Sequence, residues 1–473
     1  MIDASVIERL KAAVGPRGVV DDPAELLPHV TEWRGLYKGA TPLMLRPATV
    51  EEAQAVMALC NEHAVGIVPQ AGNTSLCGGS VPDDSGDQII VSLSRLNRVR
   101  SVDAENATMV AEAGCVLADL QATAEAAERI FPLSFAAEGS AQLGGFLSTN
   151  AGGTNVLKYG NARDQVLGLE VILPDGRLWE GLRLLRKDNT GYDLKHLFIG
   201  AEGTLGLITA ASLKLFPKPR SRVTAWLGLK DVAAAISLLA LARELSGDMV
   251  TGFELMPRNG LEMVLRHIAG TRDPLADRWP WYILMELSSG LPQPIVQAVA
   301  DDILEAGTDK GLIADGVVAS SEAQAQELWK LREVMSETQK LEGASIKHDV
   351  SVPVSAVARF IEEGMAAVTA FMPGARPVPF GHLGDGNIHF NISQPVDADA
   401  QAFLARWEDM NEVVHGIVAT FGGSISAEHG IGALKRDLLP RYKSAVEMEL
   451  MRQLKATLDP KGIMNPGKVL ATG

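Results

Sequence analysis

Two histidines in a glycine-rich stretch of the second half of the chain are the residues best placed to do chemistry. Residues 379–393 read PFGHLGDGNIHFNIS, with polar and apolar residues alternating from position 388. This alternation predicts a strand, with His389 on its polar face. Gly384 and Gly386 permit a chain reversal that would bring His382 back beside His389. Two imidazoles are plausible ligands for a divalent metal, which needs at least one more donor.

The third donor should be a carboxylate, and a second glycine-rich segment offers one. Residues 422–432 read GGSISAEHGIG, in which Glu428 and His429 stand side by side. Glu428 would complete a site with two histidines and one carboxylate, although Asp385 could serve equally well on sequence grounds alone. The alternative interpretation, core histidines and a solvated glutamate, is less favoured because these residues gather in two glycine-rich turns.

Three further loops in the first half of the chain suit a ligand that carries phosphates. Residues 68–80, VPQAGNTSLCGGS, are rich in small residues and glycine, so successive backbone N–H groups can converge on a pyrophosphate. Residues 138–154 and 200–209 are rich in the same residue types. The first loop matches neither GxGxxG nor GxxxxGK[ST], which disfavours a nicotinamide dinucleotide site and a P-loop.

The order and spacing of these three loops resemble the FAD-binding domain of flavoenzymes of the vanillyl-alcohol-oxidase type, over roughly residues 40–217. The resemblance implies FAD, with pyrophosphate held by Ala71, Gly72, Asn73, Thr74, Ser75, Gly78 and Gly79. It places the flavin and ribityl chain against Gly139, Ser140, Gly145, Ser148, Gly152 and Thr154, and the rest of the nucleotide against Glu202 and Ile208. Some of these enzymes bond flavin to a histidine in or near the first loop. The nearest histidine in this sequence is His63, before the loop, so we expect non-covalent FAD.

The segments GHLGDGNIHFN and ISAEHGIGALK are similar to signatures of the FAD-linked 2-hydroxyacid dehydrogenases, most of all the branch that oxidises D-2-hydroxyglutarate. Members that oxidise D-lactate or glycolate tend to read HAGDGN instead. By position, the resemblance makes His382, His389 and Glu428 the metal ligands, which decides between Glu428 and Asp385. The metal is expected to be zinc, with manganese as runner-up.

The same resemblance assigns substrate contacts to Arg332, Ser336, Lys347, Asn391 and His429, and it brings Asn465 in the tail near the flavin ring. Ser336 is expected one helical turn beyond Arg332 on the same face. Without the resemblance, Arg332 and Lys347 would be read as surface charges. Ser336 replaces the threonine usual in this branch, and His348 an aromatic residue, so the exact hydroxy acid stays open.

These assignments imply a reaction in which His429 takes the proton of a 2-hydroxy group and hydride passes to FAD. Arg332 and Lys347, together with the metal, exceed the positive charge that one hydroxyl and one carboxylate require. We therefore expect a D-2-hydroxy diacid. Reduced flavin would need an external acceptor, such as an electron-transfer flavoprotein or a quinone or dye.

Two alternatives share much of this evidence. The first is a D-lactate or glycolate dehydrogenase of the same architecture. The second is an inactive flavin-binding subunit of a larger redox complex, which would have no need to keep His382, His389, Glu428 and His429 together. The absence of GxGxxG opposes a nicotinamide-dependent reductase.

The elements that must position these residues predict an α+β fold. Residues 166–181 read as a hairpin around Pro174-Asp175-Gly176, and residues 232–242 as a packed helix. Prolines and basic residues at 216–220 mark a domain boundary. We expect an FAD-binding domain at residues 1–217 and a substrate and metal (cap) domain at 218–473, with about 445–473 returning to the flavin.

Composition narrows the class of partner and compartment. Of 473 residues, 47% are hydrophobic and 21% charged, which suits a chain with sizeable cores. The formal charge of −15 disfavours nucleic acid and anionic membranes as partners. Three widely spaced cysteines, no signal-peptide pattern at the start and no apolar run long enough for a membrane span favour the cytoplasm. A homodimer is left open.

Overall fold

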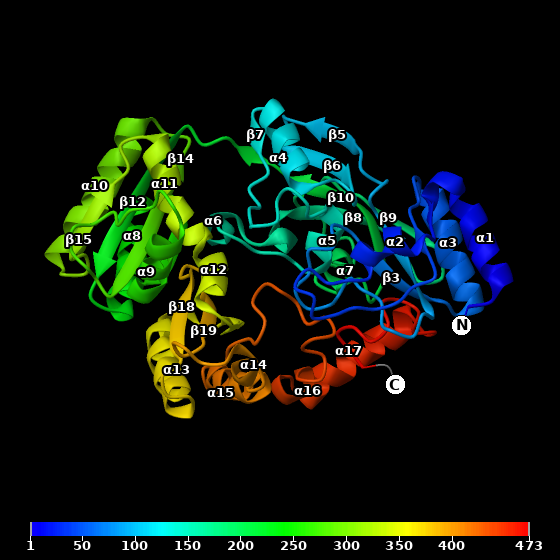
Figure 1. Ribbon diagram of the computed structural model, residues 1–473. Coiled ribbons are helices and arrows are strands. Elements are labelled where there is room, and N and C mark those ends of the chain that lie inside the picture. The colour runs from blue at the N-terminus through cyan, green and yellow to red at the C-terminus, as the bar shows by residue number, and fades with distance from the viewer. Residues whose placement is uncertain (1, 472–473) are drawn as a thin grey trace. The chain divides into compact units, whose positions relative to one another are not determined.

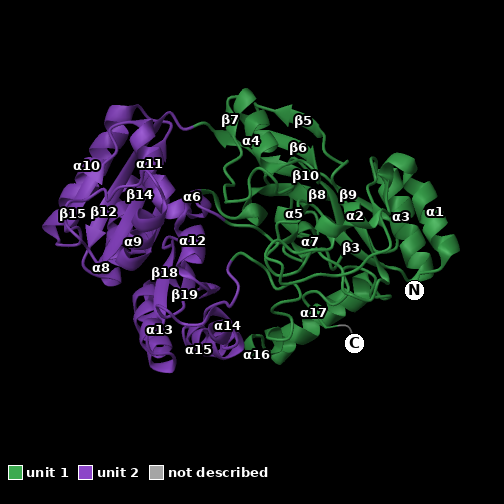
Figure 2. Ribbon diagram, viewed as in Figure 1, with its two compact units in different colours: residues 1–152, 159–218, 428–473 green, residues 153–158, 219–427 purple. Residues whose placement is uncertain are grey.

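The computed structural model describes residues 2–471 and divides the chain into two compact units (Figures 1 and 2). Unit 1 comprises residues 1–152, 159–218 and 428–473, and unit 2 comprises residues 153–158 and 219–427. The functional domains expected from the sequence, residues 1–217 and 218–473, are defined differently from these units and stay a prediction. In the division by packing, the return of the chain to unit 1 begins at residue 428.

Unit 1 contains a four-stranded sheet, a five-stranded antiparallel sheet and a two-stranded ribbon. The four-stranded sheet has the order β1 (Val19–Val20), β2 (Met44–Leu45), β4 (Gln88–Ser92), β3 (Gly66–Gln70). The five-stranded sheet has the order β5 (Val99–Asp103), β6 (Thr108–Glu112), β10 (Leu207–Lys214), β8 (Val166–Ile172), β9 (Leu178–Gly181), and the ribbon pairs β7 (Arg129–Ile130) with β11 (Phe216–Pro217). The β8–β9 pairing confirms the expected hairpin.

The helices of unit 1 cover these sheets and include the last part of the chain. They are α1 (Ala4–Val14), α2 (Pro23–Leu26), α3 (Val50–His63), α4 (Leu117–Ala126), α5 (Leu143–Ser148), α7 (Lys195–Phe198), α16 (Leu439–Tyr442) and α17 (Ala445–Leu458). One core lies between α1, α3 and the four-stranded sheet and also takes in Ile463 and Met464. A second core lies between the five-stranded sheet and α4 and α5.

Unit 2 is built on one large antiparallel sheet. Its strands follow the order β15 (Asp315–Val318), β12 (Ser221–Leu229), β14 (Trp281–Ser289), β13 (Val250–Pro257), β18 (Arg376–His382), β19 (Asn387–Ser393), β16 (Ser345–Ile346), and β17 (Asp349–Ser351) also pairs with β19. Its helices are α6 (Val156–Tyr159), which ends at the first residue of the next unit 1 segment, α8 (Val232–Ser246), α9 (Arg258–His267), α10 (Gln293–Asp309), α11 (Glu322–Glu333), α12 (Met335–Thr338), α13 (Val357–Phe371), α14 (Ala400–Leu404) and α15 (Trp407–Thr420), with a 3₁₀ turn, η4 (Gln339–Glu342).

Strand alternation explains why helices cover both faces of this sheet. In β12, Ala225 and Leu227 point into one core, with α8, α10, α13 and α15, while Trp226 points into another, with α9 and α11. The packed helix expected at residues 232–242 is the first part of α8, which starts at an Asp231 N-cap and ends at Gly247 in the left-handed region.

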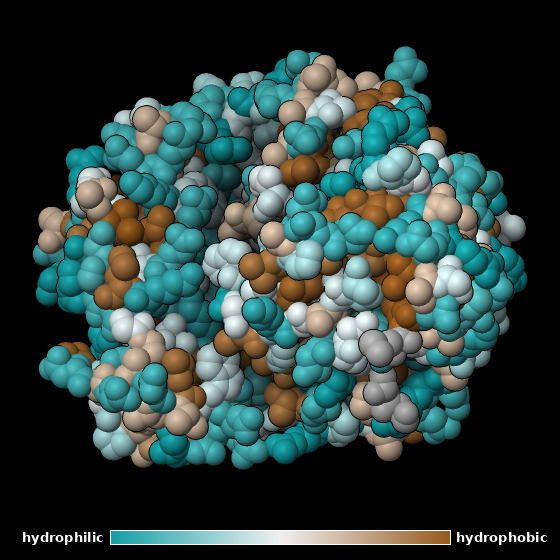
Figure 3. All heavy atoms as spheres, turned by 45° about the vertical axis from the view of Figure 1, so that its right-hand side comes forward, coloured by the Kyte–Doolittle hydropathy of each residue, from teal (hydrophilic) through white to brown (hydrophobic). Residues whose placement is uncertain are grey.

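Hydrophilic residues cover most of the face shown in Figure 3, and hydrophobic residues form smaller patches between them. Most large apolar side chains are instead in the cores described above. Among the helices of residues 2–471, none combines the length and the apolar character needed to cross a bilayer.

Candidate active site

The β18–β19 hairpin of unit 2 brings the two histidines of the first motif together. In the antiparallel register His382 pairs with Asn387, and Phe380 pairs with His389. Residues two apart share a face, so both imidazoles project from the same side of the sheet, with ring centroids 5.9 Å apart. The turn requires Gly386, which has φ 79° and where a Cβ would lie 2.1 Å from the carbonyl oxygen of Val352. The expected chain reversal is therefore present.

Glu428 lies with these histidines because it follows the last residue of unit 2. The amide of Ala427 donates to the carbonyl of Asp349 on β17 at 3.3 Å, which ties this end of the loop to unit 2. Potential ligand atoms of His382, His389 and Glu428 all lie within 4.8 Å of one another. This donor set, two imidazoles and one carboxylate, fits a zinc or manganese ion.

A second group of potential ligands, Asp349, Glu428 and His429, shares Glu428 with the first. Asp349, which the sequence motifs do not single out, is buried and pairs with His389 across β17 and β19. The available signal was its place beside His348 in a short alternating strand. Asp385, the other carboxylate considered from sequence, belongs to neither group found among residues 2–471. It caps the turn by accepting from the amide of Asn387 at 3.0 Å, and burial raises the pKa of its carboxyl.

Glu254, also missed from sequence, is the most consequential neighbour of the histidines. It is a buried carboxylate on β13, and Oε1 lies 2.7 Å from Nδ1 of His382 while Oε2 accepts from Nε of Arg332 at 2.8 Å. Burial alone would raise the pKa of Glu254, but the adjacent charges of His382 and Arg332 lower it to about 2. A single charged residue inside the otherwise apolar strand 250–257 was the signal, because buried charges require partners.

Arg332 lies at the end of α11, buried to 8% exposure, with its guanidinium 4.9 Å from the ring centroid of Phe380. The expectation that Ser336 follows one turn later on the same helical face needs correction. The helix ends at Glu333, Val334 has ψ −4°, and a new short helix starts at Met335. The break accompanies full burial of Met335 in the core beside α9.

Ser336 instead meets Lys347, which lies between β16 and β17. Nζ of Lys347 is 2.9 Å from the carbonyl oxygen of Ser336 and 3.1 Å from its hydroxyl. Asn391 on β19 is buried and donates to Oε1 of Gln339 at 3.0 Å. Nε2 of Gln339 is buried without a hydrogen-bond partner among the described residues, so a polar donor is left over beside Asn391.

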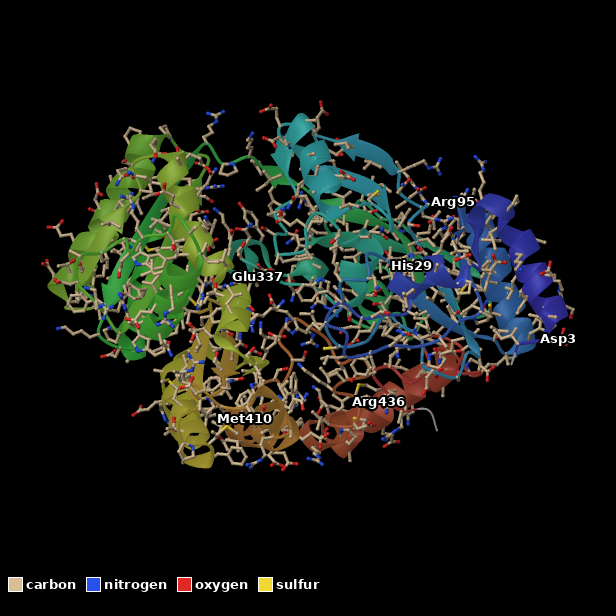
Figure 4. The ribbon with its side chains drawn as sticks, in the orientation of Figure 1. Asp3, His29, Arg95, Glu337, Met410 and Arg436 are labelled. Carbon is tan, nitrogen blue, oxygen red and sulfur yellow. The ribbon has the colours of Figure 1, made fainter. Side chains whose placement is uncertain are left out.

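The first glycine-rich loop, within residues 68–80, follows β3 and is held by side chains of unit 1. At the end of β3, Nε2 of Gln70 donates to the carbonyls of His29 and Ser80, each at 2.8 Å. His29, labelled in Figure 4, also places Nδ1 2.6 Å from Oε1 of Gln70. The sequence pointed only to His63, because nothing local connects His29 with Gln70, 41 residues further on.

The first and second loops approach each other at glycine positions. A Cβ on Gly72 would lie 2.1 Å from the carbonyl oxygen of Ser140, and one on Gly145 would lie 3.0 Å from the Cβ of Ala71. Asn73 has φ 51° and its side chain accepts from the hydroxyl of Ser80 at 2.7 Å. These contacts give the loops a tight, small-residue packing that suits close backbone approach to a ligand.

The remaining residues assigned to the cofactor are distributed as follows. The first loop of unit 1 contains Thr74, Ser75, Gly78 and Gly79. Helix α5, also in unit 1, is preceded by Gly139, ends at Ser148 and is followed by Gly152. Only Thr154 of this group lies in unit 2, in its short segment 153–158. Ile208 lies in β10, where it pairs with Val171 of β8 and its side chain packs in the core of the five-stranded sheet.

Glu202 and Asn465 connect the third loop with the C-terminal segment of unit 1. The Glu202 carboxylate accepts from the amides of Ile431 and Gly432, each at 2.7 Å, and burial raises its pKa. Nδ2 of Asn465 donates to the carbonyls of Gly79 and Glu202 at 2.9 and 2.8 Å. Oδ1 of Asn465 is buried without a hydrogen-bond partner among the described residues. This orphaned acceptor, surrounded by the loops, fits a bound cofactor with donor groups.

Comparison with protein families identifies the class. The description "FAD linked oxidases, C-terminal domain" matches residues 218–469, and "FAD binding domain" matches residues 41–181. The fold is shared with solved structures of alkyldihydroxyacetonephosphate synthase (TM-score 0.75, 18% identity, 98% of this chain and 85% of that one) and p-cresol methylhydroxylase (TM-score 0.74, 15% identity, 99% and 96%). The α+β flavoenzyme fold expected from sequence is confirmed, and the chain is an FAD-binding oxidoreductase.

Curated relatives narrow the family. The chain is 37% identical to "D-2-hydroxyglutarate dehydrogenase, mitochondrial" of Arabidopsis thaliana (99% of this chain, 82% of that protein) and 39% identical to the protein of the same name from Bos taurus (99% and 84%). It is also 37% identical to "D-2-hydroxyglutarate dehydrogenase" of Stutzerimonas stutzeri over the full length of both proteins. The chain therefore belongs to the D-2-hydroxyglutarate dehydrogenase family of FAD-linked oxidases.

Proposed function

We propose that this chain oxidises D-2-hydroxyglutarate to 2-oxoglutarate, with FAD and a divalent metal. The observation that carries the proposal is similarity over the whole chain to proteins named for this reaction, from plants, animals and bacteria. The gathering of His382, His389 and Glu428 supports it, because an inactive flavin-binding subunit has no need of these donors.

FAD would be held by the three loops of unit 1 and by Asn465, whose unpaired oxygen supports a cofactor there. When bound, FAD supplies the redox chemistry by accepting a hydride. We propose that it is non-covalent. His29 stands beside the first loop, but its Nδ1 is engaged with Gln70.

His382, His389 and Glu428 would hold the metal, most simply zinc and otherwise manganese. When bound, the metal polarises the substrate hydroxyl and lowers its pKa. His429, next to Glu428 in the chain, is the residue that takes the hydroxyl proton. The arrangement thus assigns charge stabilisation and proton removal to neighbouring residues of one loop.

Arg332, Lys347, Ser336 and Asn391, all in unit 2, would bind the substrate. Glu254 uses only Nε of Arg332, and within residues 2–471 neither terminal nitrogen of Arg332 makes a hydrogen bond, so the planar fork can still receive a carboxylate. Lys347 and Ser336 present an ammonium and a hydroxyl together.

Glu254 changes the charge argument for a diacid. The sequence-based count of positive groups omitted this buried carboxylate, which compensates one cation. A buried charged group left without its partner typically costs about 1–3 kcal/mol. Because Glu254 already compensates one cation, we expect kcat/KM to favour D-2-hydroxyglutarate over D-lactate by only on the order of 10-fold.

The proposal also covers the electron acceptor, the domain ranges, the cellular location and the oligomeric state. An external acceptor, an electron-transfer flavoprotein or a quinone or dye, would reoxidise the flavin. The working domains would be residues 1–217 and 218–473, with about 445–473 returning to the flavin, although residues 1 and 472–473 lie outside the described residues. A cytoplasmic location is proposed on composition, and a homodimer is compatible with the reaction.

Anaerobic bleaching of the flavin by a panel of hydroxy acids tests the reaction. D-2-Hydroxyglutarate should bleach the flavin fastest, its L-enantiomer should fail, and D-lactate and glycolate should react more slowly. Chelation should stop turnover while the flavin stays bound. Equal or faster bleaching by D-lactate or glycolate would replace the substrate assignment, and full activity without metal would remove the metal from the proposal.

A further inference from the structure

Glu254 joins three elements of unit 2 at one carboxylate. Its position on β13 pairs directly with His382 on β18. Its two oxygens are divided between Nδ1 of His382, at 2.7 Å, and Nε of Arg332 on α11, at 2.8 Å. The Glu254 side chain is only 1% exposed, so water cannot substitute for either partner.

The contact with His382 fixes which ring nitrogen can bind a metal. A carboxylate beside Nδ1 accepts a hydrogen bond from Nδ1–H, so the proton stays on Nδ1 and the lone pair lies on Nε2. This is the tautomer that ligates through Nε2, and the same hydrogen bond sets the orientation of the ring. Such carboxylate partners of metal-binding histidines typically contribute 10- to 100-fold to metal affinity.

The contact with Arg332 fixes the guanidinium in a similar way. Glu254 hydrogen-bonds Arg332 through Nε alone, and the centroid of the Phe380 ring lies 4.9 Å from the guanidinium carbon. Phe380 also neighbours His389, with ring centroids 5.2 Å apart. One buried carboxylate thus orients both the residue assigned to the metal and the residue assigned to the substrate carboxylate.

We propose that Glu254 is a positioning residue that couples metal ligation by His382 to carboxylate binding by Arg332. The inference rests on the proposed function, since it assumes that His382 binds the metal and Arg332 the substrate. It predicts that metal affinity and substrate KM change together when the carboxylate is altered, although Glu254 itself touches neither ligand.

Glu254→Gln is the diagnostic variant because it keeps the shape and removes the charge. An amide has one acceptor oxygen, so its NH₂ group must face either Nδ1 of His382 or Nε–H of Arg332. In the first case His382 is driven to the wrong tautomer, and in the second two donors oppose each other. Glu254→Asp keeps the charge but is one methylene too short to reach both partners.

The control is Glu286→Gln on the neighbouring strand β14. Glu286 is also a buried carboxylate, 7% exposed, but it accepts from Trp329 at 2.8 Å and Thr224 at 3.2 Å and contacts neither His382 nor Arg332. It matches the loss of a buried charge without touching the proposed coupling.

The experiment measures zinc affinity by competition with a chelator, flavin content and steady-state KM and kcat of the full chain. Glu254→Gln should lower zinc affinity about 10- to 100-fold and raise KM for D-2-hydroxyglutarate, with flavin content unchanged. Glu254→Asp should fall between it and wild type, and Glu286→Gln should bind zinc as wild type does.

The outcomes separate the inference from the function on which it rests. Zinc affinity of Glu254→Gln within twofold of wild type, or an equal loss in Glu286→Gln, would overturn the coupling alone. Wild-type protein that binds no metal would overturn the proposed metal site and the coupling with it. If Glu254→Gln fails to fold, the Asp variant decides, because an unchanged zinc affinity there refutes the proposal. A different preferred hydroxy acid would change the function and leave the zinc result standing.

Discussion

Replacing Glu342 by glutamine should destabilise unit 2 through the loss of one heavily used carboxylate. Glu342 ends η4, the turn between Ser336 and Lys347, and its side chain is 8% exposed. Its oxygens accept from Arg376 at 2.6 Å and Arg266 at 2.5 Å and lie 2.7 Å from Nε2 of His267. The carboxylate therefore fastens this turn to β18 and α9.

The magnitude follows from the pKa of Glu342. Burial alone would raise this pKa, but the hydrogen bonds from Arg376, His267 and Arg266 outweigh burial and hold it at about 2, below the usual 4.5. A fall of that size corresponds to an upper limit of about 3 kcal/mol. Arg266 is 59% exposed, so solvent screens part of the effect. We expect Glu342→Gln to lose about 1–3 kcal/mol at pH 7.

The stabilisation by Glu342 should depend on pH and should weaken in acid. Because the folded-state pKa is lowered, the stabilisation is complete above the unfolded pKa near 4.5 and is lost as pH falls toward 2. The difference in free energy of unfolding between wild type and Glu342→Gln should be constant from pH 7 to about 5.5 and should shrink at lower pH.

Tryptophan fluorescence during urea unfolding is the suitable assay, because five of the seven tryptophans, 226, 279, 281, 329 and 407, lie in unit 2. Glu363→Gln is the control, since its half-exposed carboxylate pairs with the exposed Arg359 on α13, and its loss should cost less than about 0.5 kcal/mol. A Glu342→Gln cost no larger than that of the control, or a cost that does not change between pH 7 and 4, would refute the reasoning.

Three more substitutions test other parts of the site. Gly72→Ala should release FAD, because its Cβ would collide with the carbonyl of Ser140, and the flavin absorbance per chain measures this; Gly416→Ala, where the Cβ meets open space, should retain FAD. Lys347→Met should narrow the kcat/KM ratio of D-2-hydroxyglutarate to D-lactate toward unity, and an unchanged ratio would remove Lys347 from diacid recognition. His429→Ala should lower kcat about 100-fold or more with zinc content intact, whereas an unchanged kcat would assign the proton to another base.

Local patterns made much of the fold predictable. Alternation from residue 388 predicted β19, and the turn around residues 174–176 predicted the β8–β9 hairpin. These features depend on neighbours within a few positions, where side-chain period and turn chemistry are written directly in the sequence. The candidate ligands His382 and His389 were accessible for the same reason, because one hairpin carries both.

The supporting residues were not accessible in this way. Glu254 is 128 positions from His382 and 78 from Arg332. The pairing of β13 with β18 brings His382 to it, and the packing of α11 on the sheet brings Arg332. His29 reaches the first loop across 41 positions, again through tertiary contact. The break at Val334 was hidden because the helical pattern of the sequence continues through it, although in the structure the buried Met335 begins a new helix.

The strand-like addition of residues 463–465 to β3 bears on how the protein is made. The amide of Ile67 donates to Ile463 at 2.8 Å, the amide of Asn465 donates to Ile67 at 2.7 Å, and Asn465 reaches Gly79 across 386 positions. During translation β3 can pair with β4 early, but its other edge must wait until residues 463–465 have been made. Residues 219–427 have by then left the ribosome and can already have formed their sheet. Unit 1, which has segments on both sides of residues 219–427, therefore cannot be completed until after that segment has been made.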